Sequence, residues 1–218
     1  KLKTTNPHVQ YVPVDISEGL IHHAGTQLAS IGAPVPFGLL GDFEDGQAFL
    51  FEHLNSSLPR PRLIALLGNT LGNLDVGAEK FLRQIGANMR SGDQLLLDVT
   101  TTNKTWEFDP YRTYFKSKVR RQFIAQGMAR QLGQHAHEIL DQFQDRIRAK
   151  RTKAPEYTEQ YVIYDKQTDK LALTIRAHYF DKFRSWITKE LPFDVKYANE
   201  YSFEKTTFGA GLIRLSKR

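Results

Sequence analysis

Residues 62–73 read RLIALLGNTLGN, and this stretch decides the fold class. An apolar run at 62–67 is followed at once by a turn at 68–73 that contains two glycines and two asparagines. A short apolar run bounded by turn residues is typical of a buried strand. Next come an apolar stripe at helical spacing and a second apolar run at 94–99. A strand, a helix and a strand in this order predict βα units in a mainly parallel sheet.

The same alternation precedes this stretch. We expect a strand over 9–14 that ends in Asp15, and a helix over 18–30 that begins after Ser17 and ends at Gly32. A short strand over 37–40 leads into Gly41-Asp42-Phe43-Glu44, and a helix covers 47–54.

The second half of the chain has a different pattern. Apolar residues at helical spacing predict two helices within 109–151, interrupted near Gly133. Alternating runs at 158–164 and 171–178, with turn residues between them, predict a hairpin. A helix over 179–190 and strands over 193–203 and 208–215 complete the chain.

Composition narrows the classes of function. The chain has no cysteine, so disulfides, thiolate metal sites and a cysteine nucleophile are excluded. No apolar run approaches the roughly 20 residues that span a bilayer, and no secretory signal opens the chain. We therefore expect a cytoplasmic protein without a membrane partner.

The positive charge is concentrated in one segment. The net charge is +6, and residues 116–153 hold ten Lys or Arg against three acidic residues. This segment is either a solvated helix face or a surface that attracts a phosphate-bearing partner such as nucleic acid.

Three predicted strands end in polar or glycine-rich clusters. In a parallel sheet, ligands bind beyond the carboxyl ends of the strands. Asp15 either accepts hydrogen bonds from the ribose of a nucleoside cofactor or caps the next helix. Asp42 and Phe43 suit an adenine, or mark a plain turn. The glycines of 68–73 permit close backbone approach to a ligand, and the asparagines suit a zwitterion; the alternative is a simple glycine-rich turn.

These clusters carry a family resemblance. YVPVDIS at 11–17, GDFE at 41–44 and LGNTLGN at 67–73 resemble, in order and spacing, the histidine-specific Nα-methyltransferase family. That family includes the ergothioneine-pathway enzyme, which trimethylates the α-amino group of histidine. GDQLLLD at 92–98 resembles the family's fifth strand, and the resemblance lies mainly over residues 9–99.

The resemblance implies a site. Asp15 would bind the ribose of S-adenosylmethionine (SAM), Asp42 and Phe43 the adenine, and the Gly68 backbone would line the cofactor pocket. Asn73 would hold the amino or carboxylate group of an amino-acid substrate.

Two family features have no clear match. The family's Gly-Ser-Gly type loop should stand before Tyr11, whereas residues 1–10 contain no glycine, so we expect the chain to be N-terminally truncated. The family's Glu-x-Ser pattern, which recognises the histidine side chain, has only Asn199-Glu200-Tyr201-Ser202 as a candidate. Glu200 is therefore a candidate substrate ligand, and Asp98 is a further pocket candidate.

The catalytic group is not identified by any motif. Tyr111 and Tyr114, after the strand at 94–99, are candidates to donate to a carboxylate or pack over the sulfonium; the alternative is a place in the insertion core. His135 and His137 are two residues apart and do not share a helix face, so we expect no metal site.

The resemblance predicts a fold and a domain plan. We expect an α/β, Rossmann-like class I methyltransferase sheet with an α+β insertion. Residues 1–108 form the cofactor-binding core without its first strand, 109–178 a helical and hairpin substrate or lid region, and 179–218 the last helix and return strands.

Three functions follow as hypotheses. The first is a SAM-dependent methyltransferase that N-methylates an amino acid or other small, histidine-like amine. The second is a methyltransferase of nucleic acid or protein that uses the basic 116–153 segment. The third is a non-catalytic interaction module with the same fold. The methyl acceptor, the number of methyl groups transferred and the oligomeric state do not follow from the sequence.

Overall fold

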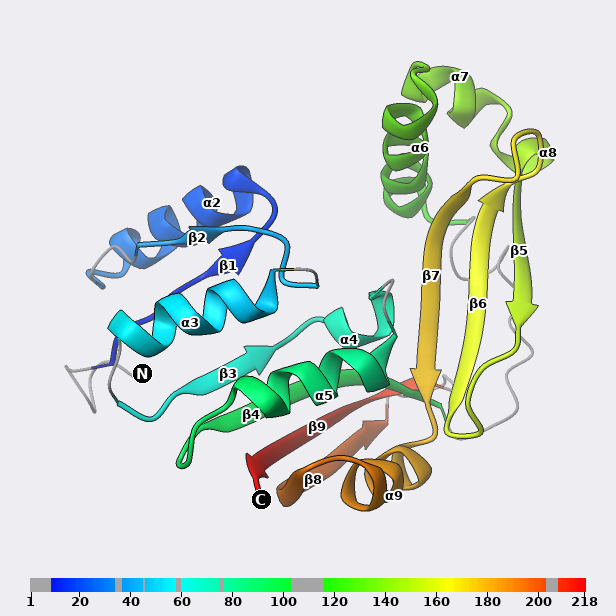
Figure 1. Ribbon diagram of the computed structural model, residues 1–218. Coiled ribbons are helices and arrows are strands. Elements are labelled where there is room, and N and C mark those ends of the chain that lie inside the picture. Colours follow the sequence, from blue (N-terminus) through cyan, green and yellow to red (C-terminus); the bar gives the residue numbers. More distant parts are fainter. Residues whose placement is uncertain are drawn as a thin grey trace. The chain divides into compact units, whose positions relative to one another are not determined.

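The computed structural model describes residues 9–33, 37–44, 46–57, 60–74, 77–102, 116–202 and 208–218. The chain forms two compact units, Lys1–Arg60 and Pro61–Arg218, whose elements are labelled in Figure 1. Among the described residues, no helix has the length and apolar character that crossing a membrane requires.

The first unit is a pair of βα segments. Strands β1 (Val14–Asp15) and β2 (Leu39–Leu40) are parallel, with Val14 opposite Leu39 and Asp15 opposite Leu40. Helix α2 (Glu18–Ser30) follows β1, and helix α3 (Gln47–Ser57) follows β2. The strand predicted over 37–40 is present as Leu39–Leu40, whereas the one predicted over 9–14 is reduced to Val14–Asp15. The predicted helix over 47–54 extends to Ser57.

Local sequence explains where α2 begins and how it packs. The Ser17 hydroxyl accepts a hydrogen bond from the Leu20 amide at 3.4 Å, so Ser17 is the N-cap that the sequence predicts. Gly32 follows the helix with φ of 70°, a backbone conformation that favours glycine. A Cβ on Gly38 would lie 2.2 Å from Ile21, which shows that the segment entering β2 packs directly against α2.

The second unit is built around β4 (Gln94–Thr102). Strand β3 (Leu63–Leu66) runs parallel to it, with Leu63 opposite Gln94 and Leu66 opposite Leu97. Helices α4 (Thr70–Asn73) and α5 (Ala78–Asn88) connect the two strands, and α5 buries the predicted apolar stripe. The βα unit predicted from residues 62–99 is confirmed.

Further strands extend this pair into a mixed sheet. Its order is β5 (Ile147–Thr152), β6 (Thr158–Asp165), β7 (Leu171–His178), β4, β9 (Phe208–Lys217) and β8 (Phe193–Ser202), with β3 beside β4 (Figure 1). Strand β7 is parallel to β4, whereas the pairs β4–β9, β8–β9, β5–β6 and β6–β7 are antiparallel. The parallel arrangement therefore holds for the first half of the chain, and antiparallel pairing dominates the second half.

The domain plan stays a prediction, but strands from all three predicted regions share this sheet. Strand β4 lies within 1–108, β7 within 109–178 and β9 within 179–218. Helix α9 (Phe180–Glu190), which the sequence predicts, connects β7 to β8.

Three helices cover one face of the β5–β7 hairpin region. Helices α6 (Lys118–Leu132), α7 (Ala136–Asp141) and α8 (Phe143–Arg146) pack on these strands through an apolar cluster. The cluster includes Ile124, Met128, Ile139, Phe143, Ile147, Ile163 and Ile175. Gly133, with φ of 65°, ends α6 at the predicted interruption.

The predicted second helix is wrong at its C-terminal end, because Ile147–Thr152 is strand β5. Ile147 continues the helical spacing of Ile139 and Phe143, but its backbone pairs with Asp165 of β6. The chain passes from α8 into β5 at Arg146. The Nε and Nη2 of Arg146 donate to the two Asp165 carboxylate oxygens, each at 2.9 Å, and so fix this junction. Both side chains are buried, and these hydrogen bonds lower the pKa of Asp165 to about 2.

Candidate active site

Asp15 and Asp42 follow the two strands of the first unit. Because β1 and β2 are parallel, the chain leaves both at the same edge. The Gly41 amide donates to the Asp15 carbonyl at 3.0 Å, so the segment that carries Asp42 starts beside Asp15. Asp15 is half-buried, Asp42 is exposed, and Phe43 is half-buried in the turn after Asp42.

Each carboxylate shapes its own turn through one oxygen. The Asp15 Oδ1 accepts from the Ser17 amide at 2.8 Å, and the Asp42 Oδ1 accepts from the Glu44 amide at 2.8 Å. Asp15 thus positions the N-cap residue of α2, as one of its two predicted roles requires. An ionised carboxylate accepts through both oxygens, so this hydrogen bond leaves acceptor capacity for a ribose hydroxyl.

The turn 68–73 lies in the second unit and is anchored to β4. The Gly68 amide donates to the Asp98 carboxylate at 3.1 Å, and the Thr100 amide donates to the Asn69 side chain at 2.9 Å. Gly68 and Asn69 adopt φ of 75° and 60°. Within the part of the chain that the structure describes, and apart from the two residues next to Gly68, no atom lies within 4 Å of a Cβ placed on it, so this backbone is open to close approach.

The second half of the turn presents Asn73 to solvent. Leu71 and Leu74 are buried on either side, whereas Asn73 is exposed. A Cβ on Gly72 would lie 2.5 Å from Nδ2 of the Asn69 side chain, so glycine is required for α4 to pack on this side chain. The buried leucines and Gly72 therefore hold a short helix whose exposed residue is Asn73.

Arg176 on β7 contacts this turn, and sequence reasoning did not identify it. Its Nη1 donates to the Leu74 carbonyl at 2.6 Å and to the Gly72 carbonyl at 3.3 Å. Its Nε donates to the Gln160 side chain at 2.6 Å. Single arginines in strands carry no sequence signal for such a contact, because the partner groups are backbone carbonyls about 100 residues away.

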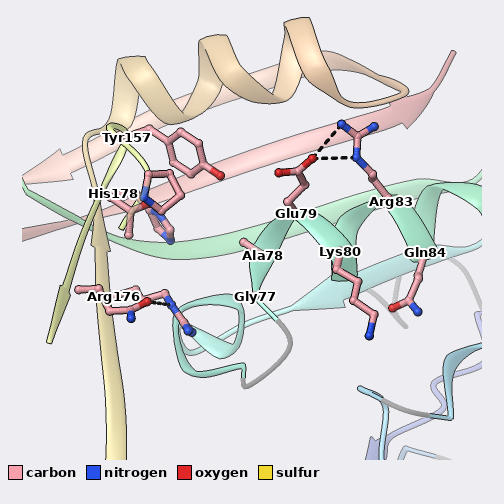
Figure 2. Close-up of a pocket in the computed structure, with 12 residues that line it drawn as sticks. Gly77, Ala78, Glu79, Lys80, Arg83, Gln84, Tyr157, Arg176 and His178 are labelled. Carbon is pink, nitrogen blue, oxygen red and sulfur yellow. Dashed lines mark hydrogen bonds and ion pairs between the residues drawn. The ribbon is translucent and has the colours of Figure 1, made fainter. Parts of the chain in front are cut away.

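A cavity of about 570 Å³ lies between the start of α5 and the strands β6 and β7. Figure 2 shows Arg176 and His178 on one side of it and α5 residues on the other. Its wall is formed by Gly77, Ala78, Glu79, Lys80, Arg83, Gln84, Pro155, Tyr157, Thr158, Gln160, Arg176 and His178. Glu79 and Arg83 form an exposed ion pair at 3.0 Å across one turn of α5.

His178 and Tyr157 contribute neutral groups to this wall. His178 is fully buried, its Nδ1 lies 2.8 Å from the Thr158 hydroxyl, and its ring stacks on Phe183 at 4.2 Å. Burial lowers the pKa of His178 to about 3 and raises the pKa of Tyr157 to about 12. Both groups are therefore uncharged at neutral pH.

The remaining predicted residues lie elsewhere. Glu200 is exposed on β8, opposite Gly211 of β9, and does not line the cavity. Tyr111 and Tyr114 lie outside the described residues. The predicted site residues thus form two groups: Asp15, Asp42 and Phe43 in the first unit, and Gly68, Asn73 and Asp98 in the second.

Comparison with known proteins decides the family. Residues 1–178 match the family described as histidine-specific methyltransferase, SAM-dependent. The chain belongs to this family. The match covers both groups of site residues and the strands β5–β7, so this histidine-specific methyltransferase family member is an enzyme that uses SAM.

Two further comparisons of this family member concern solved structures and curated proteins. A SAM-dependent methyltransferase from Clostridium acetobutylicum ATCC 824 is structurally similar, with 10% sequence identity and a TM-score of 0.42; the similarity covers 94% of this chain and 74% of that one. No curated protein matches the chain significantly.

The residues present fit the cofactor. The carboxylates of Asp15 and Asp42 have acceptor oxygens of the kind that ribose hydroxyls and an adenine amino group need. At Gly68, a backbone without a Cβ permits the close approach of a ligand.

Proposed function

We propose that this chain methylates the amino nitrogen of an amino acid or a similar small, histidine-like amine. The observation that carries this proposal is the turn 68–73, which is anchored at Asp98 and Thr100 and leaves Asn73 exposed at its end. An exposed side-chain amide both donates and accepts, so it matches an ammonium or a carboxylate group.

For the cofactor, we propose that Asp15 binds the ribose and that Asp42 and Phe43 hold the adenine. The Gly68 backbone would border the same ligand. The family membership supports a cofactor of this kind.

SAM supplies an activated methyl group and its own leaving group. The chain's residues then have to align the amine, exclude water and receive one proton from the ammonium form. Asn73 is proposed to orient the acceptor, with Glu200 as a second candidate ligand. Tyr111 and Tyr114 are the proposed groups near the reacting atoms.

The nucleic-acid alternative receives less support from the basic segment than its composition implies. At least three of its ten cations have partners within the fold: Arg146 with Asp165, Arg148 with two backbone carbonyls, and Arg151 with Glu159. Lys116, Lys118, Arg120 and Arg130 are exposed.

The test is methyl transfer by the full chain from SAM to a panel of acceptors: L-histidine, other amino acids, histamine and RNA. We expect a methylated amino acid or small amine, detected by mass spectrometry. Asn73→Ala should lower kcat/KM for that acceptor by about tenfold to a hundredfold, since hydrogen bonds to charged groups contribute about 1.5–3 kcal/mol.

Asn88→Ala is the matched control, because the Asn88 side chain donates to the Gln84 carbonyl one turn earlier in α5. Methylation of RNA alone would favour the second hypothesis, and a chain that binds no SAM would favour the non-catalytic module. Equal kcat/KM for Asn73→Ala and the wild type would remove Asn73 from the site.

A further inference from the structure

We propose that Arg176 is a positioning residue for the methyl acceptor, because it fixes the turn that carries Asn73. The inference rests on the proposed function of Asn73. It adds a residue from β7, far from the turn in sequence, to the groups that determine how the acceptor is held.

The contacts of Arg176 bracket Asn73. Its Nη1 donates to the carbonyls of Gly72 and Leu74, the residues immediately before and after Asn73. These carbonyls belong to the C-terminal end of the four-residue helix α4, where carbonyl groups have no partner within a helix. Gly72 and Leu74 are buried, so the guanidinium supplies hydrogen bonds that water does not replace easily.

The guanidinium itself is held in place. Its Nε donates to Gln160 Oε1 on β6 at 2.6 Å, and Gln160 Nε2 donates to the Thr152 hydroxyl on β5 at 3.0 Å. A continuous series of hydrogen bonds thus runs from β5 through β6 and β7 to the turn. Arginine suits this place because its planar group donates in several fixed directions at once.

The two ends of the turn are fixed by different groups. Gly68 and Asn69 are bound to Asp98 and Thr100 of β4, whereas Gly72 and Leu74 are bound to Arg176. Loss of Arg176 should therefore disturb Asn73 and leave the Gly68 end in place. Because a displacement of about 1 Å can lower the rate by about a hundredfold, the effect on methyl transfer should be large.

The experiment compares Arg176→Met with Arg148→Met. Arg148 is the matched control, because it also donates to two backbone carbonyls, those of Gln144 and Ile147, but within the α8–β5 segment. We expect Arg176→Met to raise the KM for the acceptor or lower kcat by at least about tenfold, with the Kd for SAM changed less than about twofold. Arg148→Met should leave all three values close to those of the wild type.

Two further variants separate positioning from general stability. Arg176→Lys keeps a cationic donor group without the planar geometry of arginine, so it should recover part of the lost kcat/KM. It serves alone if Arg176→Met does not fold. The double variant Arg176→Met/Asn73→Ala should have a kcat/KM only slightly below that of Asn73→Ala, because both changes remove the same function, the positioning of the acceptor by Asn73. Additive losses, or equal losses in Arg148→Met, would overturn the inference.

A measurement without catalysis distinguishes this inference from the proposed function. Hydrogen exchange of the amides in residues 68–74 should be faster in Arg176→Met than in Arg148→Met, as followed by mass spectrometry. If the wild type methylates no acceptor, the proposed function fails, but faster exchange still supports the role of Arg176 in fixing the turn. Unchanged exchange contradicts that role whatever the activity.

Discussion

At the residue scale, the two asparagines of the turn 68–73 have different surroundings. Asn69 has a left-handed backbone, and its side chain accepts from the Thr100 amide within the fold. Asn73 is exposed. The sequence suggested both amides as ligand groups, whereas in the structure the side chain of Asn69 anchors the turn and that of Asn73 is exposed.

His178 predicts a dependence of stability on pH. Its pKa of about 3 lies below the ordinary value of 6.5, so between these values the unfolded chain binds a proton that the folded chain does not. The contribution is complete above pH 6.5 and decreases as the pH falls toward 3. From pH 6.5 to pH 5 we expect the free energy of unfolding to fall by about 2 kcal/mol from this group.

Urea unfolding at pH 7, 6 and 5 checks this expectation. The decrease should be smaller in His178→Asn, which keeps a polar group near Thr158, and unchanged in His137→Asn, whose side chain is exposed. If the free energy of unfolding falls equally with pH in His178→Asn and the wild type, His178 does not titrate in this way.

At the scale of elements, the junction between α8 and β5 depends on one buried ion pair. Arg146 and Asp165 are 4% and 0% exposed and make two hydrogen bonds. The helical spacing of apolar residues continues through Ile147, so the pattern alone cannot reveal that the chain becomes a strand there. The backbone pairing of Ile147 with Asp165 on the neighbouring strand β6 makes this segment a strand.

Asp165→Asn should therefore destabilise the protein by about 3–5 kcal/mol at pH 7, because it leaves the Arg146 charge buried without its counter-charge. Asp181→Asn, in an exposed pair with Arg184, should change the free energy of unfolding by less than about 1 kcal/mol. The pKa of Asp165 is lowered from 3.8 to about 2, so its contribution is complete above pH 3.8 and decreases toward pH 2. Equal urea midpoints for the two variants would contradict this assignment.

At the scale of the whole molecule, cofactor roles are proposed for residues of each unit. Asp15 belongs to Lys1–Arg60, and Gly68 belongs to Pro61–Arg218. Each of these roles predicts that a change at that residue lowers the affinity for SAM.

We expect Asp15→Ala to weaken SAM binding by at least about tenfold, through loss of charge-assisted hydrogen bonds. Gly68→Ala should also weaken it, since φ of 75° is strained for alanine and its Cβ lies where the ligand would approach. Calorimetric titration with SAM measures both, and the exposed Asp181→Ala is the control. Unchanged affinity in Asp15→Ala would count decisively against the proposed site.

The sequence by itself determined most of the elements and the family. Ser17, Gly133 and the apolar stripe of α5 fix helix ends and faces through local geometry, and LGNTLGN carries its signal in consecutive residues. Only the tertiary structure decided that residues 147–152 form a strand, that β9 pairs antiparallel with β4, and that Arg176 reaches the turn. These features depend on partners distant in sequence, and a linear pattern contains no record of which backbone groups will meet.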